Sequence, residues 1–464
     1  MMVRSHHTVI GTSTVFQAAV FLALATSIST AEATSSSDQT AIKTHSQPSR
    51  EVLITLPDQK RPIPEPAPAG RQTTGFKIRG TKGWAWTPEQ YLAEIPVLAR
   101  YKMNFLMNCY LSLFDMKAKA GHQNRWWEPF SPALKNDYER VVRQCQKHNI
   151  EFCFAMHPNL GSSRMIDYDS DTDLDSLWQH YAWMAGLGVN WFSICLDDIH
   201  GGIDPAGQAK LVNRMFERLR VKNPQAKMVF CPTVYMGTGV DQPNARAYLP
   251  VLAEHLHPDV YCFWTGPRVV SLTITRADAE SYKSQIKHRL IIWDNYPVND
   301  ANPTLHLGPI IARDADLCEV ADGYMANPLS PQNQINRLPL LTQADYAYNP
   351  AGYDPARSIG QAIFHLADTT PQRRVLRDLV ELFPGNLTDS TKNTDYNPVL
   401  ERFEEVMGQP NSRYLADLMI QHVQDVSIRF KKTFPDRFDA ARNTLAGTLK
   451  RMQEAYAKRY GRPD

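Results

Sequence analysis

Short, almost wholly apolar segments alternate with amphipathic segments through the middle of the chain. Apolar runs begin near residues 75, 103, 150, 189, 227, 259, 288 and 319. Between most of them lie patterns of helical period, at 88–101, 133–148, 174–186, 205–221, 245–256 and 276–287. Strands that are apolar on both faces are typical of a parallel sheet covered by helices. The alternation therefore predicts a (β/α)8 TIM-like barrel over residues 73–349. An open doubly wound sheet is the alternative, but no glycine-rich phosphate loop follows the first predicted strand.

The pattern changes on both sides of the predicted barrel. After residue 350 the apolar runs end, and segments such as 413–430 and 437–460 have helical period, which predicts an α-helical C-terminal region over 350–464. Residues 34–72 are polar and contain several prolines, so we interpret them as a linker.

The first 33 residues have the features of a signal peptide. A short basic start precedes an apolar run at 15–25, and small residues follow it. The run is too short for a comfortable membrane span, although an N-terminal anchor is the alternative. We expect a secreted or exported protein, periplasmic or extracellular, with no membrane span in the mature chain.

Composition narrows the possible partners. The 50 Lys and Arg residues nearly balance the 48 Asp and Glu residues, for a net charge of +2, so charge gives no reason to expect a nucleic acid partner.

The seven cysteines are an odd number and form no CxxC pair. Five of them lie inside apolar runs and are expected to be buried core residues: Cys109, Cys153, Cys195, Cys231 and Cys262.

Polar and aromatic residues follow five of the predicted strands at their carboxyl ends, where the active site of such a barrel lies. Taken singly, each is typical of a helix cap, a turn or the core. Their joint occurrence favours a functional site, which comprises Asp197, Asp198, Tyr235, Trp264, Trp293, Asn295, Asp300 and Asn327.

The adjacent acids Asp197 and Asp198 suggest a particular chemistry. Two neighbouring carboxylates do not both ionise easily, so one retains a proton and serves as an acid near neutral pH. Immediate neighbours are poorly placed to act from opposite faces of a sugar ring as acid and nucleophile. The substrate must then supply the nucleophile, and the carbonyl oxygen of a 2-acetamido group is able to do so.

Together and in this order, these segments resemble glycoside hydrolase family 84, which includes O-GlcNAcases and bacterial enzymes known as hyaluronidases. The resemblance covers about residues 75–345. It implies retaining, substrate-assisted hydrolysis of terminal 2-acetamido-2-deoxy-β-hexosides through an oxazoline. The substrate would be a glycan or glycoprotein containing N-acetylhexosamine, and no cofactor or metal would be needed.

The resemblance also implies a role for each matching residue. Asp197 would orient and polarise the acetamido N–H, and Asp198 would be the general acid and then the base. Tyr235 would bind the acetamido oxygen. The other expected substrate contacts are Gly83 through its backbone, Trp264, Trp293 as a wall of the acetamido pocket, Asn295 positioning the acids, and Asp300 and Asn327 on O4 and O6.

The sequence departs from the family pattern at two places. The family usually has a Tyr where Lys82 stands, and it has a Lys after the second strand, where the region around Leu111 has none. Lys82 and Lys117 are the candidates to replace that lysine. These departures leave open whether the sugar is of gluco or galacto configuration.

Two other functions are weighed against hydrolysis by this mechanism. One is a carbohydrate-binding protein on an inactive barrel, but a pure binder needs no proton donor. The other is a metal-dependent glycan hydrolase or deacetylase that uses Asp197, Asp198 and His200. Its weakness is that His157, His200 and His306 show no HxxxH-type spacing.

Overall fold

The computed structural model describes residues 52–65, 75–114, 124–199, 203–241, 243–330, 334–387 and 393–461. The predicted signal peptide, Lys117 and His200 lie outside the described residues, so export stays a prediction.

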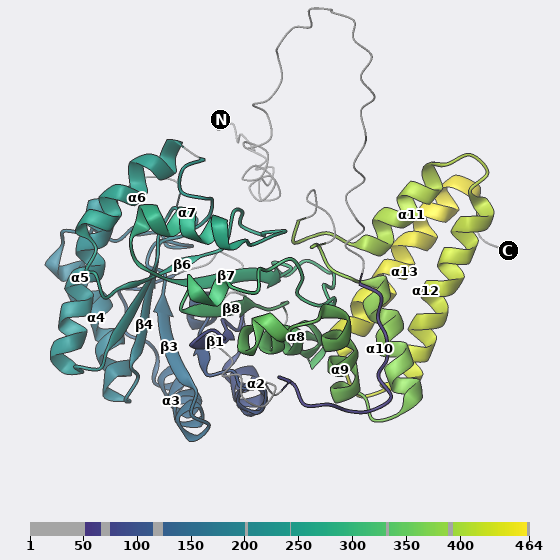
Figure 1. The fold of residues 1–464 in the computed structure, drawn as a ribbon, viewed down its shortest axis with the longest axis horizontal. Coiled ribbons are helices and arrows are strands. Elements are labelled where there is room, and N and C mark those ends of the chain that lie inside the picture. The colour runs from purple at the N-terminus through teal and green to yellow at the C-terminus, as the bar shows by residue number, and fades with distance from the viewer. Residues whose placement is uncertain are drawn as a thin grey trace, which may run out of the picture. The chain divides into compact units, whose positions relative to one another are not determined.

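Within the described residues, eight parallel strands close a barrel in sequence order (Figure 1). β1 pairs with β2 on one side and with β8 on the other, so the sheet has no free edge. The predicted (β/α)8 barrel is confirmed. Its strands are β1 (Ile78–Thr81), β2 (Phe105–Met107), β3 (Glu151–Met156), β4 (Trp191–Cys195), β5 (Lys227–Cys231), β6 (Tyr261–Trp264), β7 (Arg289–Pro297) and β8 (Gly323–Asn327).

Helices follow most of the strands, close to the predicted positions. Thr87 shows how one begins: its hydroxyl accepts from the backbone N–H of Gln90, whose side chain in turn accepts from Thr87 N, and Pro88 takes the first helical position. The barrel helices are α2 (Pro88–Arg100), α3 (Pro132–Lys147), α4 (Asp171–Gly186), α5 (Pro205–Lys222), α6 (Pro243–His255), α7 (Arg276–Ile286) and α8 (Arg337–Tyr348).

Alternate residues of the strands form two separate apolar clusters. Residues such as Phe105, Trp191 and Phe263 fill the barrel interior. Their sequence neighbours, such as Phe192 and Trp264, pack outward against the helices. The five cysteines expected in the core are buried and unpaired. This alternation decides which residues beyond a strand end face the mouth of the barrel.

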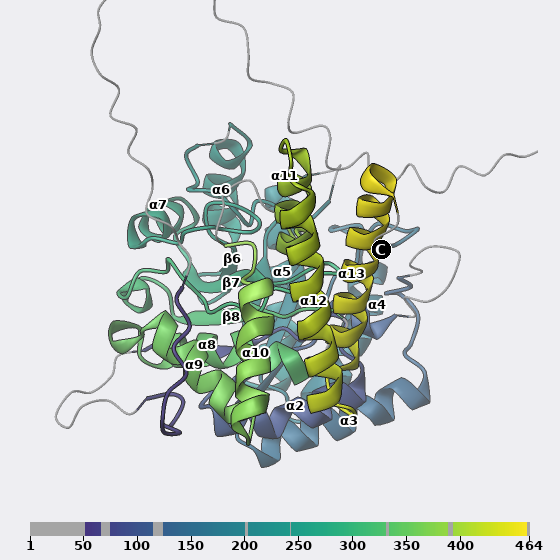
Figure 2. The same ribbon diagram turned by 90° about the vertical axis from the view of Figure 1, so that its right-hand side faces the viewer.

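A group of helices follows the barrel, and the predicted helical C-terminal region is confirmed: α9 (Pro355–Leu366), α10 (Thr370–Leu382), α11 (Pro398–Gly408), α12 (Arg413–Thr433) and α13 (Asp439–Tyr460). Figure 2 shows α10, α12 and α13 side by side. Val426 and Phe430 of α12 are buried. Hydrogen bonds such as Leu307 N to Phe383 O, at 2.9 Å, join this region to the barrel. No helix in the described part of the chain is long and apolar enough to cross a membrane.

The described part of the predicted linker, residues 52–65, contains neither helix nor strand but packs on α8 and α9. Ile54 and Ile63 are buried. Arg61 N donates to Gln361 Oε1 at 2.8 Å, and Glu65 N donates to Asp345 Oδ1 at 3.1 Å. This segment is therefore part of the folded unit.

Candidate active site

Inward-facing side chains at the carboxyl ends of the strands meet at the barrel mouth. On β4, Trp191 and Cys195 face inward, and the same alternation continues to Asp197. Ile78 of β1 and Ala155 of β3 also face inward. Continuing the alternation past the end of each strand leads to Lys82 and His157. Side chains from distant parts of the sequence therefore converge on one end of the barrel.

Asp197 is buried and held from two sides. Tyr110 OH donates to its Oδ2 at 2.8 Å. His157 Nε2 lies 2.6 Å from the backbone oxygen of Asp197, and burial lowers the pKa of His157, so the ring is neutral. The backbone N–H groups of Asn159 and Leu160 donate to Nδ1 of His157, which therefore carries its proton on Nε2 and donates to Asp197 O. Among the described residues, Oδ1 of Asp197 has no hydrogen-bond donor.

Asp198 turns away from the strand and remains accessible to solvent. Its φ of 56° lies in the left-handed region, which is costly for a non-glycine residue and breaks the alternation of β4. Desolvation by the surrounding protein, followed by the charge of Asp197, raises the pKa of Asp198. Tyr235 OH donates to Asp198 Oδ1 at 2.8 Å and opposes this rise. The two carboxyl groups thus differ in burial and in hydrogen bonding.

Lys82 lies at the centre of an aromatic pair that the sequence did not reveal. Its Nζ is 4.1 Å from the ring centroid of Trp293 and 4.6 Å from that of Tyr110. Lys82 is 3% exposed. Tyr110, in the 3-10 turn η1 (Tyr110–Leu113) after β2, thus contacts both Lys82 and Asp197. Tyr110 was missed because nothing in the sequence marks a turn residue as inward-facing.

Asn295 and Asn327 form a second polar pair. Asn327 Nδ2 donates to Asn295 Oδ1 at 2.8 Å, and Asn295 Nδ2 donates to Val269 O at 2.9 Å. In the described structure no hydrogen bond joins Asn295 to Asp197 or Asp198. Asn295 therefore does not hold the acids directly, contrary to what the resemblance implied. Instead it ties β8 to the loop after β6.

Trp264 is not in the barrel mouth, contrary to its expected role in substrate binding. It is fully buried on the outer side of β6, because its neighbour Phe263 takes the inward position. Its ring stacks on Tyr282 of α7 with centroids 5.6 Å apart, and its Nε1 donates to Gly237 O at 2.9 Å. Trp264 therefore supports the wall of the barrel.

Gly83 and Asp300 are the two remaining residues that were expected to contact the substrate. Gly83 has a φ of 67°, and a Cβ there would lie 2.4 Å from Cε1 of Tyr91, so a glycine is required. Its carbonyl accepts from Tyr91 OH at 3.0 Å. Asp300 is exposed in the loop after β7, with a φ of 48°, and no contact in the described structure joins it to the acids.

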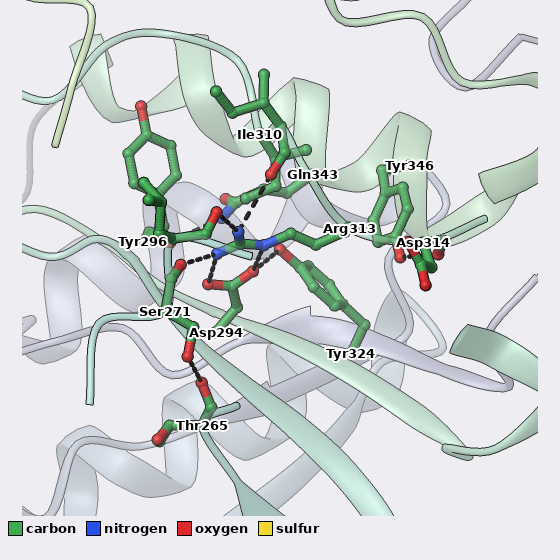
Figure 3. A network of polar contacts seen from close by, with 12 residues as sticks. Thr265, Ser271, Asp294, Tyr296, Ile310, Arg313, Asp314, Tyr324, Gln343 and Tyr346 are labelled. Atoms are coloured by element: carbon green, nitrogen blue, oxygen red, sulfur yellow. Dashed lines mark hydrogen bonds and ion pairs between the residues drawn. The ribbon is translucent and has the colours of Figure 1, made fainter. Parts of the chain in front are cut away.

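A buried ion pair lies behind β7, on the outer side of the strand (Figure 3). Asp294 accepts from Nε and Nη2 of Arg313, both at 2.8 Å, and from Tyr324 OH at 2.6 Å. Arg313 Nη2 also donates to Ser271 O at 2.8 Å. Arg313 and Asn295 therefore both hold the loop after β6. Asn295 is itself a residue of β7, and Arg313 is bound to Asp294 of β7.

The described residues contain no group of three or more His, Cys, Asp or Glu side chains that could hold a metal ion. His200, the third member of the alternative metal site, lies outside them.

Comparison with known proteins agrees with the fold. Two solved structures share the fold at 22% identity. The protein CpGH84B has a TM-score of 0.65 over 81% of this chain and 66% of that one. A mutant of the Thermobaculum terrenum O-GlcNAc hydrolase has a TM-score of 0.64 over 82% of both chains.

Curated relatives include Protein O-GlcNAcase from mouse, 27% identical over 264 residues, and from rat, 26% identical over 263 residues. Each alignment covers 54% of this chain, and the chain spans 27% of the length of each relative. The family model for beta-N-acetylglucosaminidase matches residues 77–381, which include all eight barrel strands and more than half of the chain. The chain therefore belongs to the β-N-acetylglucosaminidases of glycoside hydrolase family 84.

Proposed function

We propose that the protein hydrolyses terminal 2-acetamido-2-deoxy-β-hexosides with retention, and that the substrate's acetamido group is the nucleophile. The natural substrate would be a glycan or glycoprotein that carries N-acetylhexosamine. Family membership supports the class of reaction. The observation that carries the mechanism is the convergence of two sequence-adjacent carboxyl groups, Asp197 and Asp198, on one barrel mouth. Groups so close in the chain are poorly placed to flank a sugar ring, which is what a two-carboxylate mechanism needs.

The two acids suit different steps. Asp197 is buried, and its Oδ1 lies 3.6 Å from Nε2 of His157 and has no hydrogen-bond partner among the described residues. This oxygen would accept the acetamido N–H and stabilise positive charge as the carbonyl oxygen attacks C1. Asp198 is accessible and has a raised pKa, so it would give its proton to the leaving oxygen as the glycosidic bond breaks. Water would then attack C1 of the oxazoline, and the ionised Asp198 would take the proton from that water.

Tyr235 and Trp293 would complete the acetamido pocket. Tyr235 OH donates to Asp198 in this structure, and with substrate bound it would turn this donor to the acetamido oxygen. Trp293 is buried at the mouth, and its Nε1 has no acceptor among the described residues. Both would favour the closed ring of the intermediate over the open substrate.

Fluorination of the N-acetyl methyl group tests the proposed nucleophile. We expect the rate of hydrolysis of nitrophenyl glycosides, measured as kcat/KM, to fall with each fluorine, because fluorine withdraws charge from the attacking oxygen. From acetyl to trifluoroacetyl the loss should reach about 10²-fold or more, the order seen when one stabilising group of a transition state is removed. An N-propionyl glycoside, whose acyl group is larger than acetyl but withdraws no charge, is the control for size. An unchanged rate, or a trapped aspartyl–sugar ester, would count against the proposal.

The pH profile should report the contact between Tyr235 and Asp198. The acid form of Asp198 is the active form, so activity falls as pH rises through its pKa. Tyr235 OH stabilises the ionised form, and Tyr235→Phe should raise that pKa further. We expect the alkaline limb of the kcat/KM profile to move to higher pH while the maximum rate falls. Tyr414→Phe, at an exposed position on α12, should leave the profile unchanged.

A further inference from the structure

Each acid of the candidate site accepts a hydrogen bond from a tyrosine of its own. Tyr235 OH donates to Asp198 Oδ1 at 2.8 Å. Tyr110 OH donates to Asp197 Oδ2, also at 2.8 Å. The proposed function gives a task to Tyr235 but none to Tyr110.

The backbone that carries Tyr110 is fixed against the barrel. The side chain of Asn108 extends the pairing of β2 with β3, since its Nδ2 donates to Ala155 O at 2.9 Å and its Oδ1 accepts from Ala155 N at 2.8 Å. Cys109 N donates to the hydroxyl of Tyr91 at 2.9 Å. The 3-10 turn η1 begins at the next residue, so the chain reaches Tyr110 in a defined position.

The ring of Tyr110 is held by two neighbours and is 4% exposed. Nζ of Lys82 lies 4.6 Å from its centroid, and the imidazole of His157 meets it edge-on with centroids 5.1 Å apart. Burial, followed by the charge of Asp197, raises the pKa of Tyr110 well above its usual range, so the phenol keeps its proton. Tyr110 is therefore a fixed hydrogen-bond donor.

This donor determines which oxygen of Asp197 is left for a ligand. Tyr110 occupies Oδ2, whereas Oδ1 lies 3.6 Å from Nε2 of His157 and has no donor in the described structure. His157 donates instead to the backbone oxygen of Asp197, at 2.6 Å. Without the Tyr110 hydroxyl, the carboxyl group would be free to turn about its Cβ–Cγ bond, a torsion with broad minima.

We infer that Tyr110 is a positioning residue for the reaction, whose hydroxyl holds the Asp197 carboxylate with Oδ1 ready to accept the acetamido N–H of the substrate. This inference rests on the proposed function, in which Asp197 assists attack by the acetamido oxygen. A carboxylate that is already oriented needs no reorganisation as charge develops in the transition state. Tyr110 acts through Asp197 and contacts no reacting atom.

Tyr110→Phe tests this role, because it removes the hydroxyl and keeps the ring between Lys82 and His157. We expect kcat/KM for aryl and alkyl 2-acetamido glycosides to fall about 10- to 100-fold, the usual range for a hydrogen bond to a charged group. The loss should lie mainly in kcat and be equal for good and poor leaving groups, since every substrate requires attack by the acetamido oxygen. A loss that grew for poor leaving groups would place the effect at Asp198 and overturn the inference.

A double-variant cycle separates positioning from support of the fold. In an Asp197→Ala background, Tyr110→Phe should change kcat/KM by less than about 2-fold, because the carboxylate through which Tyr110 acts is absent. An equal loss in both backgrounds would mean that the hydroxyl only stabilises the barrel mouth, which contradicts the inference. The matched control is Tyr181→Phe, which removes another buried hydroxyl that donates to Ser193 O of β4 at 2.7 Å. It should leave kcat/KM nearly unchanged in either background.

Failure of the proposed function would be visible in the wild type. If the wild type did not hydrolyse these glycosides, or if its rate were indifferent to fluorination of the N-acetyl group, the proposed function would be wrong and this inference with it. A wild type that passes both tests, together with an undiminished rate in Tyr110→Phe, would contradict the inference alone.

Discussion

Asp198→Asn is expected to slow hydrolysis most for substrates with poor leaving groups. An alkyl glycoside needs a proton on its departing oxygen, and the loss of this general acid should lower its kcat/KM by about 10²- to 10⁴-fold. An aryl glycoside with an acidic phenol leaves with little help, so its loss should be much smaller. The measurement is kcat/KM across a series of glycosides ordered by the pKa of the leaving group.

Asp197→Asn provides the matched comparison. The buried Asp197 carboxylate is proposed to assist attack by the acetamido oxygen, which every substrate requires. Its removal should lower the rate by about 10²-fold or more for all leaving groups alike. If both variants lost the same factor across the series, the separate roles of Asp197 and Asp198 would be wrong.

Arg313→Met is expected to lower the free energy of unfolding by about 3–5 kcal/mol, because it leaves Asp294 buried without its ionic partner. Both side chains are almost wholly inaccessible, and Arg313 also holds the loop after β6 through Ser271 O. Urea unfolding followed by circular dichroism measures the change. Arg276→Met, which removes surface ion pairs to Glu280 and Glu319, should change stability little.

A double variant checks the cause of that loss. Asp294→Asn combined with Arg313→Met removes both charges and should recover part of the stability, since no uncompensated carboxylate remains. An additive loss in the double variant would mean that packing or the loop contacts of Arg313, rather than the buried charge, dominate.

The sequence predicted the barrel well because most strands are apolar on both faces and some helices have a recognisable start signal, such as Thr87 and Pro88 before α2. It also singled out Asp197 and Asp198, because adjacent carboxylates after a buried strand are a strong local signal, and their catalytic roles stay a prediction. Trp264 was misplaced for a physical reason. A motif shows that a residue ends a strand, but the side it faces depends on the alternation along β6, where Phe263 points inward.

The other differences arise from contacts between segments far apart in the chain. Tyr110 reaches Asp197 across 87 positions, and Asn295 bonds to Asn327 across 32. Such pairs depend on strand register and on turn geometry, and no local pattern encodes either. The packing of residues 52–65 was hidden for a similar reason, since the partner of Arg61 is 300 positions away.

The pairing of β1 with β8 affects the order in which the molecule is assembled. Gly80 and Met325 are register partners although 245 positions separate them, so closing the sheet brings together the two ends of a very long chain loop. Such distant contacts have a large loop-closure entropy and form slowly. Lys82 and Asn327 lie on the two sides of this seam, whereas Asp197 and Asp198 lie on the far side of the barrel. A partly folded chain that has paired β2 to β7 would therefore hold both acids while Lys82 and Asn327 are still apart. Because Asn327 is expected to bind the sugar, the return of sugar binding during refolding would report the closure of the seam.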